Sequence, residues 1–598
     1  MPVTSSPDRE FHRYKCRICS YIYNERTGES QTDTLPGTRF EDLADEWKCP
    51  ICQAGKNAFI LIQIEDAWSG RTVAEVLIDQ ITTFGITEFF GVPGTSSLGI
   101  IDAIRKNPVA RFTLFRHEEN AALAASAYNK LTGKIAVCVT IAGPGATNLA
   151  TGLYDAKEDR ASVLSLNGQV EMQYSGPGGF QEIDQDAFFR PVTVYNNTIY
   201  DRKMALKILT LALQHAIVRS GVAQISVPND IQKQPLEAGL TMPQGCFPSL
   251  KISPDDDILI RAAAMLDLSE SPVILAGWGA YPYSDLVLSF AKSIDAPILS
   301  TFRAKGILPD DHPLYAGILG TVGSIQARNL VEQSDLLITL GVGFSKMTRV
   351  PEGIPMLQVD RDPLKLGKGN RSLPVYGDVG EVLARLIPNV RQRGKPTAPK
   401  KVKAVTVPWN TQRDEEADAK ATPIRPPYIM KVLSDIIPDD ALISIDVGEN
   451  GWWFGRNFRM KKQQFVMSGY LATMGFGFPG AIAAKLAYPG RPVFCITGDG
   501  GFAMAMADFV TAVTNNLPII VIILNNRELG MIRVEQKVEN YENFATGLSN
   551  PDFVMYSKAC GGEGKRVSEP EDLSRAVRWA MQQSCPVIVD VDTDPNRF

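Results

Sequence analysis

The sequence predicts an α/β protein of three domains, each a doubly wound parallel β-sheet with helices on both faces, preceded by a small metal-binding domain. Two cysteine pairs lie near the N-terminus, and short apolar runs then alternate with helical stretches to the end of the chain. Strands buried on both faces of a parallel sheet have such continuous apolar sequences, and their alternation with helices is typical of α/β folds. Residues 228–254 are rich in Pro and Gly without clear periodicity, and 391–427 are rich in Lys, Pro, Thr and Asp, so both segments are predicted to be linkers between the three domains.

Length and composition exclude several classes of protein. At about 150 residues per domain, 598 residues suggest about four domains. The net charge of −5 argues against a nucleic-acid-binding protein, which carries a basic excess. No apolar run approaches the roughly 20 residues of a membrane span, and the polar N-terminus lacks the apolar core of a signal peptide. We therefore expect a cytoplasmic protein with no membrane span and no nucleic-acid partner.

The first domain, predicted over 1–64, contains two CxxC motifs, Cys16 to Cys19 and Cys49 to Cys52. Each motif can present two thiolates to one ion, and two motifs together complete a tetrahedron. Four sulfur ligands in this geometry suit zinc or iron. Four unrelated cysteines would rarely have this spacing, so the sequence predicts a metal site.

The segment that contains and flanks the cysteine pairs is rich in aromatic residues, namely Tyr14, Tyr21, Tyr23, Phe40, Trp47 and Phe59. With the turn-like sequences PGT at 36–38 and FEDL at 40–43, these residues make 14–59 resemble rubredoxin. The resemblance implies one iron ion, bound by the four cysteines, that passes single electrons. Rubredoxins usually have glycine after each CxxC motif, whereas this chain has Ser20 and Gln53, and a non-glycine residue at positive φ costs energy. A structural zinc ion is the alternative.

Beyond residue 64 the sequence predicts three α/β domains over 65–235, 236–400 and 401–598. Their boundaries are placed in or near the two Pro-rich linkers. The predicted strands are continuous apolar runs, at 135–141, 162–166, 273–276, 336–340, 356–359, 442–445, 493–496, 519–524 and 587–591.

The last domain contains a GDG sequence after one predicted strand and an Asn pair after the next. Asp499 and Asn526 therefore lie at carboxyl ends of strands, where α/β sheets bind ligands, and their oxygens suit Mg²⁺. The glycines around Asp499 allow a diphosphate to approach the backbone; they are Gly498, Gly500 and Gly501. The pattern resembles the thiamine diphosphate motif. The resemblance implies that Asp499, Asn526 and the backbone carbonyl of Glu528 hold Mg²⁺ on the cofactor.

Two further segments of this domain match the same family. Met474 occupies the position of the bulky apolar residue that bends the cofactor. The DVGEN loop at 446–450 matches a segment that contacts the diphosphate, with Gly448, Glu449 and Asn450 as the residues concerned.

The first α/β domain supplies the predicted activating carboxylate. Thiamine diphosphate chemistry needs one acid on the pyrimidine ring, and the protein otherwise contributes shape. Glu118, the first acid after His117, matches the family position, and Glu119 is the less favoured candidate. The FQE sequence at 180–182 matches a family signature, which implies that Gln181 points at the substrate or at its adduct with the cofactor and makes Phe180 a further catalytic candidate.

Residues 66–598 as a whole resemble the pyruvate oxidase and acetolactate synthase group. This resemblance implies a pyrimidine-binding domain, a central domain and a diphosphate-binding domain, in that order. The central domain of the group often binds FAD, although some relatives bind ADP there or nothing. The candidate FAD contacts follow predicted strands; they are Gly277, Gly279, Ala280, Lys305, Gly341, Asp360 and Asp378.

Glu535 favours an oxidase, because acetolactate synthases usually have tryptophan at this position. We therefore expect oxidative decarboxylation of a 2-oxoacid, most simply pyruvate, with electrons leaving through the four-cysteine site. The alternatives are an acetolactate synthase-type carboligase whose metal-binding domain is structural or regulatory, a non-oxidative decarboxylase, and a redox carrier or regulatory protein with an inactive thiamine diphosphate fold. The resemblance also implies a homodimer or homotetramer. A soluble electron acceptor is expected, because the tail of membrane-bound pyruvate oxidases has no counterpart after 587–591.

Overall fold

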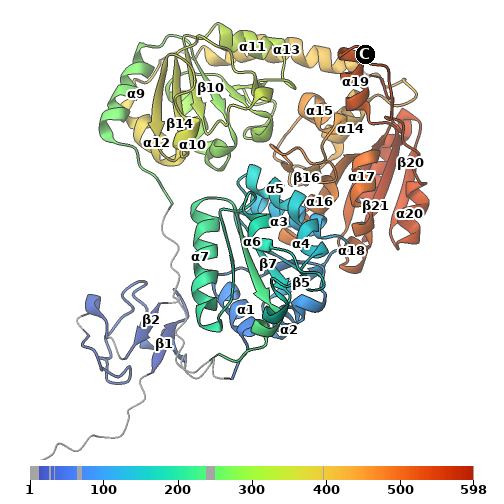
Figure 1. The fold of residues 1–598 in the computed structure, drawn as a ribbon. Helices are drawn as coiled ribbons and strands as arrows, with labels where there is room; N and C mark the ends of the chain where they lie inside the picture. The colour runs from blue at the N-terminus through green and yellow to red at the C-terminus, as the bar shows by residue number, and fades with distance from the viewer. Residues whose placement is uncertain are drawn as a thin grey trace, which may run out of the picture.

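The computed structural model describes residues 12–62 except 20, 26, 27 and 33, then 70–236, and 250–596 except 395. These residues contain a three-stranded antiparallel sheet near the N-terminus and three six-stranded parallel sheets (Figure 1). The predicted fold class is thereby confirmed. The small sheet has the order β2-β1-β3, with β1 at Arg13–Cys16, β2 at Ile22–Asn24 and β3 at Phe59–Ile62.

The first parallel sheet has the strand order β5-β4-β6-β7-β9-β8. Its strands are β4 (Glu88–Gly91), β5 (Arg111–Leu114), β6 (Ala136–Thr140), β7 (Val163–Gln169), β8 (Tyr195–Thr198) and β9 (Val222–Pro228). The helices are α1 (Val73–Thr83), α2 (Leu98–Lys106), α3 (Glu118–Thr132), α4 (Pro144–Asn148), α5 (Ala150–Glu158), α6 (Gln185–Phe189), α7 (Ala205–Val218) and α8 (Asn229–Gln232).

The central sheet has the order β12-β11-β10-β13-β14-β15. Its strands are β10 (Pro272–Ala276), β11 (Ile298–Ser300), β12 (Tyr315–Ile318), β13 (Leu336–Leu340), β14 (Met356–Asp360) and β15 (Ser372–Tyr376). The helices are α9 (Asp256–Leu268), α10 (Ser284–Ser293), α11 (Ile325–Glu332) and α12 (Val379–Leu386). The long helix α13 (Ala398–Glu416) follows this domain in the chain, packs on α11 and β12, and leads to the third domain.

The third sheet has the order β17-β16-β18-β19-β21-β20. Its strands are β16 (Leu442–Ile445), β17 (Gln464–Met467), β18 (Val493–Gly498), β19 (Ile519–Asn525), β20 (Glu563–Val567) and β21 (Val587–Asp592). The helices are α14 (Pro426–Ile436), α15 (Glu449–Asn457), α16 (Gly477–Ala487), α17 (Asp499–Ala505), α18 (Phe509–Thr514), α19 (Gly530–Val538), α20 (Phe553–Ala559) and α21 (Pro570–Ala580). Among the described residues, no helix has the length and apolar character needed to cross a membrane.

Successive residues of the central strands belong to different apolar cores, because side chains alternate between the two faces of a strand. In β6, Val137 and Val139 pack with α1 and α7, whereas Ala136 and Cys138 pack with α3. Both faces of each parallel sheet are therefore buried, which explains the continuous apolar runs in the sequence.

One core is shared by the first and third domains. The Ala-rich helix α3 packs against α16, and both contribute to a single cluster of buried residues. Small side chains on α3 allow the two helices to approach closely. At the N-terminal end of α3, the side-chain amide of Asn120 donates to Asp508, with 2.6 Å between Nδ2 and Oδ2.

A buried charge cluster joins all three domains. Lys130 of α3 contacts two acids at the end of α5, with Nζ 2.7 Å from Asp155 Oδ2 and 2.5 Å from Asp159 Oδ2. Arg303 of the central domain contacts Asp159 at 3.0 Å. Asp159 also accepts hydrogen bonds from the backbone amides of Gly469 and Tyr470, at 2.8 and 3.0 Å, in the loop that leads to Met474.

The two predicted linkers are partly regular structure. Residues 228–236 belong to the first domain. They contain α8, and Pro235 forms an isolated antiparallel β-bridge with Thr72. The segment 391–427 contains the 19-residue helix α13, whose Val402 and Val405 are buried. The prediction of an irregular linker was therefore wrong for this helix, which has few apolar positions to reveal its period.

Candidate cofactor and metal sites

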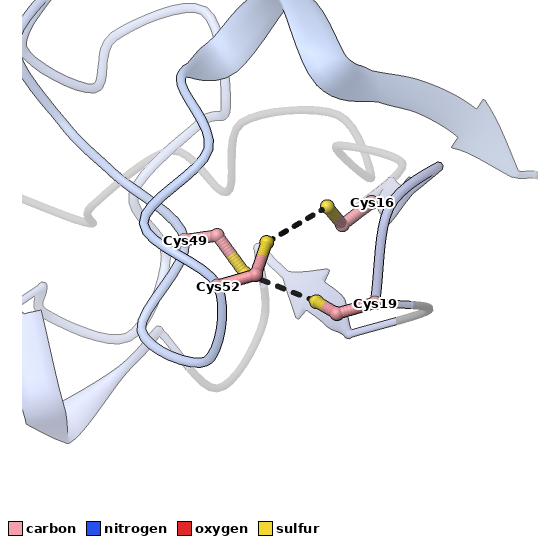
Figure 2. A group of neighbouring side chains, drawn as sticks. All are labelled: Cys16, Cys19, Cys49 and Cys52. Carbon is pink, nitrogen blue, oxygen red and sulfur yellow. Dashed lines mark hydrogen bonds between the residues drawn. The ribbon is translucent and has the colours of Figure 1, made fainter.

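The four cysteines of the N-terminal domain converge on one point (Figure 2). The Sγ atoms of Cys16 and Cys52 are 3.6 Å apart, those of Cys19 and Cys49 are 3.4 Å apart, and all four lie within 4.8 Å of one another. With metal–sulfur bonds of about 2.3 Å, a tetrahedron has edges of about 3.8 Å. The residues therefore fit one four-coordinate ion, and the geometry suits zinc and iron equally.

Backbone hydrogen bonds shape each cysteine turn. Cys16 N–H donates to Tyr21 O and Cys49 N–H donates to Ala54 O, both at 2.8 Å. Gln53 has φ of +61°, so a non-glycine residue does occupy the left-handed conformation expected at this position. Ser20, its counterpart in the first turn, lies outside the described residues.

The predicted aromatic core of this domain is present. The rings of Tyr14 and Phe40 stack with centroids 4.1 Å apart, and Trp47 meets Phe59 at 5.4 Å. These side chains pack around Cys16 and Cys49, which are buried, whereas Cys19 and Cys52 are partly exposed. One edge of the metal site therefore faces the surface.

Asp499 and Asn526 lie at the carboxyl ends of the neighbouring strands β18 and β19. Asp499 is 2% exposed, and its Oδ2 accepts a hydrogen bond of 2.6 Å from Asn550. Burial raises the pKa of Asp499, although the Asn550 amide opposes this shift. A divalent cation would favour the ionised form, so a buried acid beside an amide oxygen suits Mg²⁺.

The other predicted residues of the third domain gather around this pair. A Cβ atom on Gly500 would lie 3.6 Å from Met474 Cε, so the methionine borders the GDG turn. A Cβ atom on Gly530 would meet both Glu449 Oε2 and Asn526 Nδ2. The structure thus brings together four segments that are far apart in the sequence; the predicted residues they contribute are Gly448, Glu449, Asn450, Met474, Gly498, Gly500, Gly501 and Asn526.

Asp446 begins the matched loop 446–450 but was not singled out as a site residue, yet it holds the turns of this site in place. Its carboxylate accepts hydrogen bonds from Val447 N–H at 2.7 Å, Gly475 N–H at 2.9 Å and the Thr497 hydroxyl at 2.9 Å. Burial raises the pKa of Asp446 to about 6. Because it binds the residue after Met474 and the end of β18, it positions both turns. Its place directly after strand 442–445 was the available signal.

Glu528 and Glu535 lie beyond Asn526. The carboxylate of Glu528 pairs with Arg533 at 2.9 Å and accepts a hydrogen bond from the Thr546 hydroxyl at 3.0 Å. Glu535 is an exposed residue of α19. Both assignments stay predictions.

The predicted activating acid, Glu118, is the first residue of α3 and is buried. Its Oε2 accepts a hydrogen bond of 3.0 Å from Asn148, and a Cβ atom on Gly145 would lie 3.2 Å from its Oε1. For the neighbouring Glu119, burial raises the pKa while His117 opposes the shift. Glu118 therefore has a defined position near the carboxyl end of β6.

Gln181 lies close to the same turn. Gly143 has φ of +65°, and a Cβ atom there would lie 2.8 Å from Gln181 O. Gln181 itself has φ of +62°, whereas Phe180 is 89% exposed. The group containing Glu118 and Gln181 belongs to the first domain and the group containing Asp499 belongs to the third.

The candidate FAD contacts lie at the carboxyl edge of the central sheet. Gly277 and Gly279 pack directly on Gly341, since a Cβ atom on Gly277 would lie 2.0 Å from Gly341 O. The structure thus gives these glycines a packing role, beside Ala280, which is fully buried. Asp360 ends β14, where burial raises its pKa, and Asp378 caps α12.

Lys305 differs from the other candidates. Its side chain is 1% exposed, and Nζ lies 3.6 Å from Asp310 Oδ2. A role of these residues toward FAD stays a prediction.

Comparison with known protein families agrees with this arrangement. Residues 71–188 match the N-terminal TPP binding domain of thiamine pyrophosphate enzymes, 259–386 match their central domain, and 446–591 match their C-terminal TPP binding domain. Residues 13–59 match rubredoxin.

Individual relatives match most of the chain. A putative thiamine pyrophosphate-containing protein, YdaP, from Bacillus subtilis is 37% identical over 87% of this chain and 91% of its own length. Pyruvate oxidase from Lactiplantibacillus plantarum is 32% identical over 86% of this chain and 87% of its own. A probable acetolactate synthase large subunit from Methanocaldococcus jannaschii is also 32% identical, over 87% and 92%.

Proposed function

The chain belongs to the thiamine pyrophosphate enzyme family, of the pyruvate oxidase and acetolactate synthase type, and on this basis we propose that it oxidatively decarboxylates a 2-oxoacid. Pyruvate is the simplest substrate. With water as acyl acceptor, pyruvate and water give acetate, CO₂, two protons and two electrons. The electrons leave through an iron ion at Cys16, Cys19, Cys49 and Cys52.

Bound thiamine diphosphate would stabilise the carbanion left by decarboxylation, and bound FAD would accept two electrons. Asp499, Asn526 and the carbonyl of Glu528 would hold Mg²⁺ against the diphosphate. Asp446 keeps the Met474 turn and the end of β18 in place for this. Glu118 would hold the proton on the pyrimidine ring, and Asn148 orients its carboxylate.

One observation carries the choice of an oxidase: a four-sulfur metal site is joined to the catalytic domains in a single chain. A carboligase consumes no oxidant and exports no electrons, so such a site would have no redox role in it. Tethering raises the effective concentration of an electron carrier near its donor. The partly exposed edge formed by Cys19 and Cys52 offers an exit for single electrons.

The test is a visible spectrum of iron-loaded, flavin-loaded protein before and after pyruvate is added without oxygen. Flavin and ferric–thiolate bands that both bleach, with release of CO₂ and acetate or acetyl phosphate, support the proposal. Glu118→Gln is the matched control. Its iron should still be reduced by dithionite, whereas pyruvate should leave both bands unchanged.

The second candidate is acetolactate synthesis, which the similarity to acetolactate synthases favours. It predicts acetolactate from pyruvate without any electron acceptor and no change in the iron band. That result would overturn the oxidase proposal and leave the metal domain with a structural role.

A further inference from the structure

A cavity of about 20 Å³ lies where the central domain meets α13 and α15. Lys305, Asp310 and Tyr315 line it from the central domain, Arg413 from α13 and Arg456 from α15. This volume holds about one water-sized species. The cavity is separate from the sites described above, except that Lys305 also belongs to the candidate FAD contacts.

The cavity wall carries an excess of positive charge. Lys305 is 1% exposed and Arg413 is 6% exposed, and both approach the same oxygen, Oδ2 of Asp310, at 3.6 and 3.4 Å. Asp310 is the one carboxylate in the described lining. Arg456 is balanced by Glu416, which lies 2.5 Å from it and outside the cavity wall. Two buried cations thus share one anion.

The neighbouring charges do not cancel this excess. Arg459 and Lys431 both pair with Asp414 at 2.9 Å, which adds a further cation rather than an acid. A buried charge without a counter-charge costs several kcal/mol in general. Burial lowers the pKa of Lys305 to about 8; Asp310 opposes this shift and Arg413 adds to it.

Two buried polar atoms at the cavity also lack hydrogen-bond partners within the described part of the chain. Among the described residues, Arg413 Nε has no hydrogen-bond partner, and neither has Asp310 Oδ1. The Tyr315 hydroxyl is already engaged with Ser300 at 2.7 Å. A water molecule would satisfy these atoms but leave the charge uncompensated, whereas an anion would accept from Arg413 Nε and neutralise the excess.

We propose that the cavity binds a small monovalent anion of the halide class between Lys305 Nζ and Arg413 Nε. The anion completes the contact between the loop that contains Lys305 and helix α13. It therefore couples the docking of the central domain to anion concentration, independently of the reaction that the enzyme catalyses.

The test compares thermal unfolding of the full chain in chloride and in gluconate, which is too large for the cavity, at equal ionic strength. We expect chloride to raise the apparent melting temperature by about 2–4 °C, which is the order of shift that one added interaction causes in a domain of about 150–250 residues. Arg413→Met leaves one cation with one carboxylate, so the difference between the salts should disappear. Asp310→Asn removes the carboxylate, so the difference should increase.

Arg328→Gln is the control for general salt effects, because Arg328 forms an exposed pair with Glu332. It should retain the wild-type difference. A crystal grown with bromide should show an anomalous peak between Lys305 and Arg413, which does not depend on any variant folding. Equal melting temperatures in both salts, or a bromide-free cavity occupied by water, would overturn the proposal.

Discussion

Asp159 contacts residues of all three domains, and the variant Asp159→Asn tests how much these contacts contribute to the free energy of unfolding. The variant keeps the shape of the side chain but removes its charge. Arg303 then loses its 3.0 Å ion pair, and Lys130 keeps its ion pair with Asp155 and its hydrogen bond to Met467 O. The amide nitrogen of the new asparagine must also face donors. In place of Oδ2 it meets Lys130 Nζ and Gly469 N–H, and in place of Oδ1 it meets Arg303 and Tyr470 N–H.

The expected loss of stability is large because the site is buried. Asp159 is 4% exposed and the side chain of Lys130 is 3% exposed. Removing one partner from a buried ion pair costs about 3–5 kcal/mol, since the remaining charge is left uncompensated. Two cations lose the same partner here, but Lys130 retains Asp155 and Arg303 lies 5.3 Å from the Trp278 ring. We therefore expect a value within that range rather than above it.

The assay is urea unfolding at several pH values, with hydrogen exchange at Gly469 and Tyr470. Burial opposes ionisation of Asp159, but the charges of Lys130 and Arg303 lower its pKa in the folded protein. The ionised carboxylate therefore stabilises the fold above the unfolded pKa of about 3.9, and this contribution disappears as the pH falls through the lower folded value. The difference between wild type and variant should be complete at neutral pH and shrink below about pH 4.

The two backbone amides should exchange faster in the variant. Asp102→Asn, at an exposed pair on α2, is the control and should change stability little at any pH. Equal stability of wild type and Asp159→Asn at neutral pH, with unchanged exchange, would refute the reasoning.

Three further predictions concern single sites. Gly145→Ala places a Cβ atom 3.2 Å from Glu118 Oε1 and only 2.3 Å from Thr140 Oγ1 of β6. The free energy of unfolding should fall by about 1–3 kcal/mol in thermal unfolding, and kcat should fall because the acid is displaced. An unchanged kcat would contradict this placement of Glu118. Asn550→Ala removes the hydrogen bond to Asp499 and should weaken Mg²⁺ activation about 10–100-fold in a titration of activity, with the KM for pyruvate changed less. Gln53→Gly relieves a positive φ and should stabilise the N-terminal domain by up to about 1 kcal/mol in denaturant unfolding; a less stable variant would contradict the expected backbone cost.

The sequence predicted what depends on local pattern. The two CxxC motifs, and the placement of Asp499 and Asn526 after buried strands, follow from residues that lie near one another in the chain. The buried charge cluster around Asp159 was not predicted, because Gly469, which donates a hydrogen bond to it, lies about 310 residues further along the chain and neither residue belongs to a motif. The burial of Lys305 was missed for the same reason, since Arg413, which shares the carboxylate of Asp310 with it, lies on a helix that the composition did not reveal.

The core shared by α3 and α16 has a consequence for how the chain is made. The apolar faces that meet there are separated by about 350 residues, with the whole central domain between them. At about 5–20 residues per second, a ribosome needs roughly 20–70 s to supply the second face after the first has emerged. During translation, the face of α3 that packs against α16 therefore stays uncovered while the central domain is synthesised. Chains that stop within the central domain should expose this helix, associate with chaperones and aggregate.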